Sequence, residues 1–156
     1  MTEDEALSAL RQPDRAGVAR AEAALWAIWC RSGRPERDAL LAEGVAALER
    51  GDFDDAIVRF TRLVEMAPDW AEAWNKRATA RYLARDFAGA IADCEATLAR
   101  KPHHFGALSG QGLCHMALEQ YAAAAACFRR ALAVHPSLTS VRANLTAALS
   151  EVVRYN

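Results

Sequence analysis

The feature that most constrains this chain is a spacing of 34 residues that recurs along it. The spacing separates prolines, small residues and alanines alike, namely Pro68, Pro102 and Pro136, then Gly44, Ala78 and Gly112, then Ala56, Ala90 and Ala124. A period of this length is typical of a solenoid, in which each unit covers the apolar face of its neighbour. The chain is therefore predicted to be an all-α solenoid.

Each unit reads as two amphipathic helices, and the stretch Ala71 to His104 shows the pattern best. It contains a tight turn at Arg85–Asp86 and a proline that ends the second helix. The small residues mark the place where two antiparallel helices approach most closely. Asp52 and Asp86 stand where the second helix of a unit begins, as N-caps, whereas Asp69 and Glu72 resemble a capping box at the start of the next unit.

These signals predict one domain over residues 1–156. It divides into an N-terminal helical cap (1–36), three repeat units (37–70, 71–104 and 105–138) and a C-terminal closing helix (139–156, beginning near Leu138). The helices of the units are expected at 37–50, 53–66, 71–84, 87–100, 105–118 and 121–134. A short helix is expected at 2–11, capped by Thr2 and Glu5, and a second from Pro13 to about Arg31.

The second N-terminal helix carries an apolar band too wide for one solvent-facing stripe. Its members are Val18, Leu25, Trp26, Ile28, Trp29 and Cys30. In one interpretation the N-terminal helices pack on the open end of the first unit, because the end of a solenoid needs a cover. In the other, Trp26 and Trp29 form a docking surface for a partner.

The 34-residue spacing, with its small residues and prolines, resembles the tetratricopeptide repeat family over Arg37 to Leu138. The phrases AEAWNKRAT and HHFGALSG also resemble short bacterial members of that family. The resemblance implies a right-handed solenoid of three helix pairs. Four places depart from the family pattern: Arg77 and Arg81 in the middle unit, and Gln111 and His115 in the third.

Composition narrows the function. Nineteen basic and 20 acidic residues give a formal net charge of −1, which argues against a nucleic-acid partner. No apolar run reaches transmembrane length, so no membrane insertion is expected. The N-terminus lacks a signal-peptide pattern, and the four cysteines lack metal spacing and read as buried free thiols. The expected compartment is the cytoplasm, or the periplasm if the native protein carries an export signal absent from this sequence.

No enzyme is predicted, since no nucleophile motif, phosphate loop or carboxylate pair is present. No catalytic residue, metal site or cofactor is expected, and the adjacent His103 and His104 read as structural. Arg77, Arg81 and Arg85 recur every fourth residue along one helix face. They favour either a salt-bridged structural cluster, with Glu43 and Asp93 as partners, or an anion site.

By resemblance to the family, the first helices of the units line a concave groove that holds extended peptides. Carried over residue by residue, the groove comprises Leu41, Val45, Leu48, Asn75, Lys76, Thr79, Tyr82, Ser109, Leu113, Met116 and Asn144. Asn75 and Lys76 are expected to form its polar centre. In co-chaperone members a carboxylate clamp occupies five of the family's positions. Those positions here carry Leu41, Val45, Lys76, Gly106 and Gly110, so the clamp is absent.

The sequence therefore predicts a protein–protein interaction module that binds a peptide or protein in its groove, as an adaptor, scaffold or assembly factor. The partner is unidentified. The alternative is a self-assembling structural protein without a peptide ligand. The expected state is a monomer or a weak homodimer.

Overall fold

The computed structural model describes residues 1–155, and its regular elements are all helices within that range. They are α1 (Glu3–Ala9), α2 (Arg15–Trp29), α3 (Pro35–Glu49), α4 (Phe53–Met66), α5 (Ala71–Leu83), α6 (Phe87–Arg100), α7 (Phe105–Ala117), α8 (Tyr121–Val134) and α9 (Thr139–Tyr155). Every predicted helix is present, with ends within two residues of those expected. The predicted all-α fold class is confirmed.

Local capping explains most of the helix starts. The side chain of Asp52 accepts the amide of Asp55 at 3.1 Å, and that of Asp86 accepts the amide of Gly89 at 3.0 Å, as predicted. Thr2 closes the predicted capping box on α1. The box predicted for α5 is wrong, because Trp70 occupies the N-cap without a side-chain bond. The Pro13 start is also wrong, since α2 begins after Asp14.

At the predicted contact, a small residue on the first helix of a unit packs against a larger side chain on the second. A Cβ on Gly44 would lie 2.3 Å from the ring of Phe60, and one on Gly112 would lie 2.4 Å from Phe128. In the middle unit the equivalent pair is Ala78 with the smaller Cys94, both buried. The first and third units therefore fill this contact with a glycine and a phenylalanine, and the middle unit fills it with an alanine and a cysteine.

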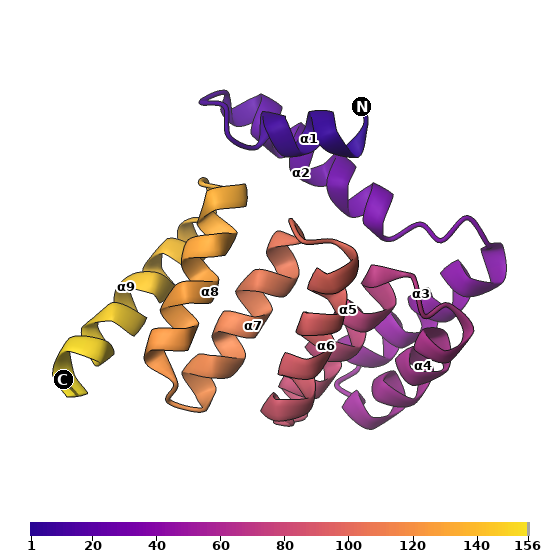
Figure 1. Ribbon diagram of the computed structural model, residues 1–156. Helices are drawn as coiled ribbons and strands as arrows, with labels where there is room; N and C mark the ends of the chain where they lie inside the picture. The colour runs from indigo at the N-terminus through magenta and orange to yellow at the C-terminus, as the bar shows by residue number, and fades with distance from the viewer. Residues whose placement is uncertain (156) are drawn as a thin grey trace.

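Helices α3 to α9 stand side by side in one row, and α9 covers the last pair (Figure 1). Val141 and Ala148 of α9 join a buried cluster with Leu108 of α7 and Phe128 of α8. This contact is the closing role expected for the C-terminal helix.

The N-terminal pair, α1 and α2, lies across one edge of this row (Figure 1). We call this the loop edge, because the inter-unit loops 67–70, 101–104 and 135–138 form it. Leu25 and Trp29 of α2 are buried with Leu10 of α1 and with Phe105, at the start of α7. The location expected for the cap, on the open end of the first unit, is wrong. The apolar band of α2 packs instead against the second and third units, at His104 and Phe105.

Among residues 1–155, no helix is both long and apolar enough to cross a membrane.

Candidate functional site: a cleft between α5 and α7

A cleft of about 270 Å³ lies between α5 and α7, with Cys94 of α6 contributing to its wall. We call it the α5–α7 cleft. Its lining is almost wholly apolar or small and consists of Asn75, Ala78, Thr79, Tyr82, Leu83, Cys94, Gly106, Gly110, Leu113 and Cys114. Such a volume suits one bulky apolar side chain of a ligand.

Two glycines one turn apart keep this cleft open. A Cβ added to Gly110 would meet only the Sγ atom of Cys94, at 3.8 Å, so the cleft here is bounded by bare backbone. A Cβ added to Gly106 would lie 2.7 Å from Cη2 of Trp26. The same helix face thus accommodates a void at Gly110 and a tryptophan from α2 at Gly106.

The structure brings together four of the eleven residues predicted for the groove: Asn75, Thr79, Tyr82 and Leu113. The other seven lie elsewhere. Leu41, Val45 and Leu48 belong to the core of the first unit, Met116 packs on that of the third, and Ser109, Asn144 and Lys76 do not line the cleft. The cleft residues missed from sequence are Ala78, Leu83, Cys94, Gly106, Gly110 and Cys114. The spacing of the two glycines was the available signal.

Asn75 is not an open polar centre, as had been expected, but part of a buried network. Its Nδ2 atom donates to Oε1 of Glu72 at 2.9 Å, and both side chains are buried. The Nε2 atom of His104 lies 2.8 Å from the other carboxylate oxygen of Glu72. Since Nδ1 of His104 accepts the amide of Ala107, the ring proton resides on Nε2 and is donated to Glu72.

Lys76 also differs from its predicted role as the single charge of the groove. Its Nζ atom lies 3.5 Å from Oε1 of Glu72 and 5.5 Å from the centroid of the Trp26 ring. The ammonium group is therefore held between a buried carboxylate and an aromatic face. Lys76 compensates Glu72 rather than presenting a charge to a ligand.

The arginine row along α5 is structural. Asp93, almost fully buried on α6, accepts two bonds from Arg77 at 2.8 and 2.9 Å and one from Arg81 at 2.9 Å. The salt-bridge interpretation is confirmed for Asp93, whereas Glu43 pairs with Arg59 instead. Because Asp93 compensates Arg77 and Arg81, the three arginines of α5 do not form the anion site considered from sequence.

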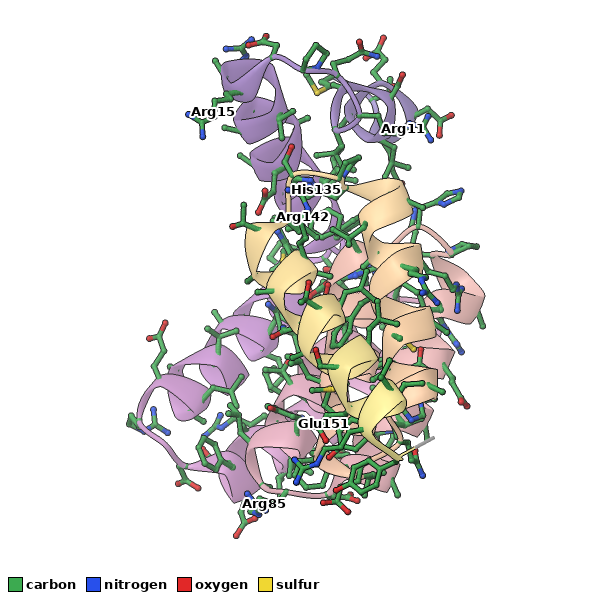
Figure 2. All side chains as sticks on the ribbon, turned by 90° about the vertical axis from the view of Figure 1, so that its left-hand side faces the viewer. Arg11, Arg15, Arg85, His135, Arg142 and Glu151 are labelled. Carbon is green, nitrogen blue, oxygen red and sulfur yellow. The ribbon has the colours of Figure 1, made fainter. Side chains whose placement is uncertain are left out.

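A larger, open cleft of about 610 Å³ lies where α2 meets the loop before α9. Arg11, Arg15 and Arg142 line it, and His135 lies beneath, with Nε2 2.8 Å from a carboxylate oxygen of Glu22. Figure 2 shows Arg11 and Arg15 on opposite sides of the N-terminal pair, away from Arg142. The three cations do not converge on one point, so this cleft is a weaker candidate than the α5–α7 cleft.

The cysteines are unsuited to nucleophilic chemistry. All four are free; Cys94, Cys114 and Cys127 are buried and Cys30 is half-buried. Burial raises the pKa of the Cys114 thiol to about 11 and also raises the pKa of Cys94. Over residues 1–155, no three His, Cys, Asp or Glu side chains gather as metal ligands would.

Two carboxyls, Glu72 in the buried network of α5 and Glu3 at the contact of the N-terminal pair with Lys101, have lowered pKa values. Burial by itself raises the pKa of Glu72, but the hydrogen bond from His104, with the charge of Lys76, outweighs it and lowers the pKa below its ordinary 4.5. Burial likewise opposes the change at Glu3, where bonds from Lys101 and Trp29 lower the pKa. Each carboxyl therefore stabilises the fold in its ionised form.

A loss of stability in acid follows from these directions. The contribution of a carboxyl with a lowered pKa is complete above its ordinary value and is lost as the pH falls through its folded pKa. The titratable groups beside Glu72 are His104 and Lys76, which contact its carboxylate, and the Cys30 thiol, whose pKa is raised by burial and by Glu72. We expect urea unfolding, followed by tryptophan fluorescence, to need steadily less urea below about pH 4.5.

The variant Glu3→Gln is the control for this pH dependence. It removes one of the two carboxyls with a lowered pKa, so its stability should fall less steeply with decreasing pH than that of the parent. Equal slopes in the two proteins would contradict the assignment of Glu3.

The fold and the cleft define a class: a helical-repeat protein with a small, apolar cleft between two of its repeat units. Family models of the tetratricopeptide repeat match residues 41–105 and 105–138. The chain belongs to the tetratricopeptide repeat family, whose modules mediate protein–protein interactions.

The chain matches parts of longer curated relatives. A TPR repeat-containing protein of Rhizobium etli is 33% identical over 100 residues, which are 64% of this chain and 48% of that protein. The Hsp70-Hsp90 organizing protein of Triticum aestivum is 32% identical over 111 residues, 71% of this chain and 19% of that protein. The chain thus corresponds to about half of the first relative and about a fifth of the second.

Solved structures support the same fold at lower identity. The Sgt2 TPR domain from Aspergillus fumigatus aligns with a TM-score of 0.75 and 23% identity, covering 79% of this chain and 83% of that one. The first TPR of Spaghetti (RPAP3), bound to the HSP90 peptide SRMEEVD, aligns with a TM-score of 0.73 and 23% identity, covering 75% and 93%.

Proposed function

We propose that the chain binds an extended segment of a partner protein in the α5–α7 cleft and acts as an adaptor, scaffold or assembly factor. The observation that carries the proposal is the apolar space left beside Gly110. Side chains able to bond a peptide backbone, those of Thr79 and Tyr82, lie in the same lining. This combination suits a ligand that inserts one apolar anchor while its backbone follows the helices.

The ligand chemistry differs from that of the peptide-bound structural neighbour. Its peptide, SRMEEVD, has three acidic residues among its last four. In this chain the clamp positions of the third unit are Gly106 and Gly110, and Lys76 is engaged by Glu72. An apolar anchor is therefore the better match than a terminal carboxylate.

Self-assembly without a peptide ligand remains the alternative. Val153 and Tyr155 are exposed near the end of α9, but the Tyr155 ring already stacks on Tyr121, with centroids 6.0 Å apart. So small a patch favours a monomer or weak homodimer. The free thiols favour a cytoplasmic location.

The variant Gly110→Leu tests the proposal by filling the cleft from the chain's own side. Its Cβ meets nothing closer than 3.8 Å, so the melting temperature should not fall. Partners captured by the parent chain should bind roughly ten- to a hundredfold more weakly, since burying one Leu or Met side chain contributes about 1.5–3 kcal/mol. Affinity is measured by titration of the captured partner.

The matched control is Ala92→Leu, which adds the same side chain at an exposed position of α6. Its affinity should equal that of the parent. Equal affinity of Gly110→Leu and Ala92→Leu would reject the α5–α7 cleft as the binding surface.

A further inference from the structure

The N-terminal pair touches the same two helices that form the α5–α7 cleft. Trp26 of α2 lies against Gly106, which also lines the cleft, and its ring faces the ammonium group of Lys76 on α5. Its centroid is 5.6 Å from that of Phe105 at the start of α7, with the rings edge to face. Trp26 therefore stands at the Gly106 end of the cleft.

A buried polar chain connects this docked helix to the cleft wall. The rings of Trp29 and His104 are stacked with centroids 4.2 Å apart. His104 donates to Glu72, which in turn accepts from Asn75, a residue of the cleft lining. A change in the position of Trp29 thus alters the groups that hold Asn75 in place.

The pair is attached to the row in a way that allows it to leave as one body. Of the seven buried members of its apolar cluster, only Phe105 comes from the repeat units. Other attachments are made by side chains: Lys101 to Glu3, Glu22 to His135 at 2.8 Å, and the indole of Trp70 to the carbonyl of Trp29 at 2.9 Å. The connection to α3 turns at Gly33, whose φ of +80° favours glycine, and Ser32 before it is bonded to Asp38 of α3.

We propose that the N-terminal pair is an intramolecular competitor for the Gly106 end of the α5–α7 cleft. A ligand that extends to Gly106 displaces Trp26 and moves the pair off the loop edge. The surface so uncovered, formed by Trp70, His104, Phe105 and Gly106, accepts an amphipathic helix that presents tryptophans. The competition rests on the proposed function of the cleft, but the docking itself is testable without any partner.

The first test uses the full chain and two glycine-to-alanine variants on the same helix. In Gly106→Ala the added Cβ would lie 2.7 Å from the Trp26 ring and 3.0 Å from Cε1 of His104, whereas in Gly110→Ala it would make only an ordinary contact with Sγ of Cys94, at 3.8 Å. Alanine favours helix over glycine at both sites, so α7 is not weakened in either variant. Amide hydrogen exchange of residues 15–29 should be roughly tenfold or more faster in Gly106→Ala than in Gly110→Ala, with α4 to α8 unchanged. Equal exchange of residues 15–29 in the two variants would overturn the proposal.

The second test asks whether the uncovered surface binds the same helix from outside. The probe is a fluorescein-labelled synthetic peptide of residues 15–31, followed by anisotropy. A full chain carrying Trp26→Ala and Trp29→Ala should bind it at least about tenfold more tightly than the parent, whose own α2 occupies the surface. Adding Gly106→Ala to that chain should abolish the binding.

A failure of the folded double variant to bind the peptide would overturn the proposal, whatever the partner experiments show. Loss of the proposed function would instead appear as an unchanged affinity of Gly110→Leu for the partner. The two failures are therefore distinguishable.

Discussion

Replacing Asp93 with alanine is expected to lower the free energy of unfolding by about 3–5 kcal/mol, the usual cost of removing one member of a buried ion pair. Asp93 is 2% exposed and accepts both bonds from Arg77 to α6 and the shorter of the two contacts that Arg81 makes there. Without it, the Arg77 guanidinium has no carboxylate partner, and Arg81 keeps only the 3.8 Å contact with Asp86. Since each unit packs only on its neighbours, the loss should be felt throughout the row.

Chemical denaturation of the parent, Asp93→Ala and Asp55→Ala measures this effect. Asp55 also receives two arginines, Arg50 and Arg59, but on the surface of α4. Surface pairs contribute little, so Asp55→Ala should cost far less than Asp93→Ala. Similar losses in the two variants would show that the Asp93 cluster is no more than a solvated ion pair.

Replacing Glu72 with alanine is expected to cost a similar amount, about 3–5 kcal/mol, for a related reason. The side chain is fully buried and is bonded by Asn75, His104 and Lys76 at once. Its removal leaves an ammonium group and two buried polar groups without an acceptor. It also frees His104, on which Trp29 stacks, so the docking of α2 should loosen together with the core.

Urea unfolding with tryptophan fluorescence follows both consequences. The control is Glu65→Ala, at an exposed position of α4, which should shift stability by no more than about 0.5 kcal/mol. A Glu72→Ala protein as stable as Glu65→Ala would mean that the buried network contributes nothing net.

The fold was predictable because its determinants are local and repeated. Helix ends follow from caps such as Asp52 and Asp86, and the pairing of helices follows from small residues spaced by 34. The same spacing places Gly44 and Phe60 of the first unit in register with Ala78 and Cys94 of the middle unit. Agreement of these signals at each level makes the architecture well determined.

The place of the N-terminal pair was not predictable in the same way. It depends on contacts between residues far apart in the chain, such as Glu3 with Lys101 and Glu22 with His135. No repeated spacing encodes them, and the wide apolar band of α2 fits an open end as well as an edge.

The site was predictable only in part, since four of its ten lining residues were among those expected. Glu72 was interpreted as a capping residue because an acid in the first turn of a helix usually serves the N-terminus. Asn75 and Lys76 follow it by three and four residues, the spacing at which helix side chains meet, so all three belong to one network. Gly106 and Gly110 were interpreted only as positions of the absent carboxylate clamp, because a glycine contributes no side chain to a binding surface.

Hydrogen exchange of the full chain, with and without its captured partner, tests the central claim most directly. If the α5–α7 cleft binds the partner, protection should rise in residues 75–83 and 106–114, on the two helices that form it. Protection confined to α9, or to the exposed faces of α4 and α6, would contradict the account and assign binding to another surface.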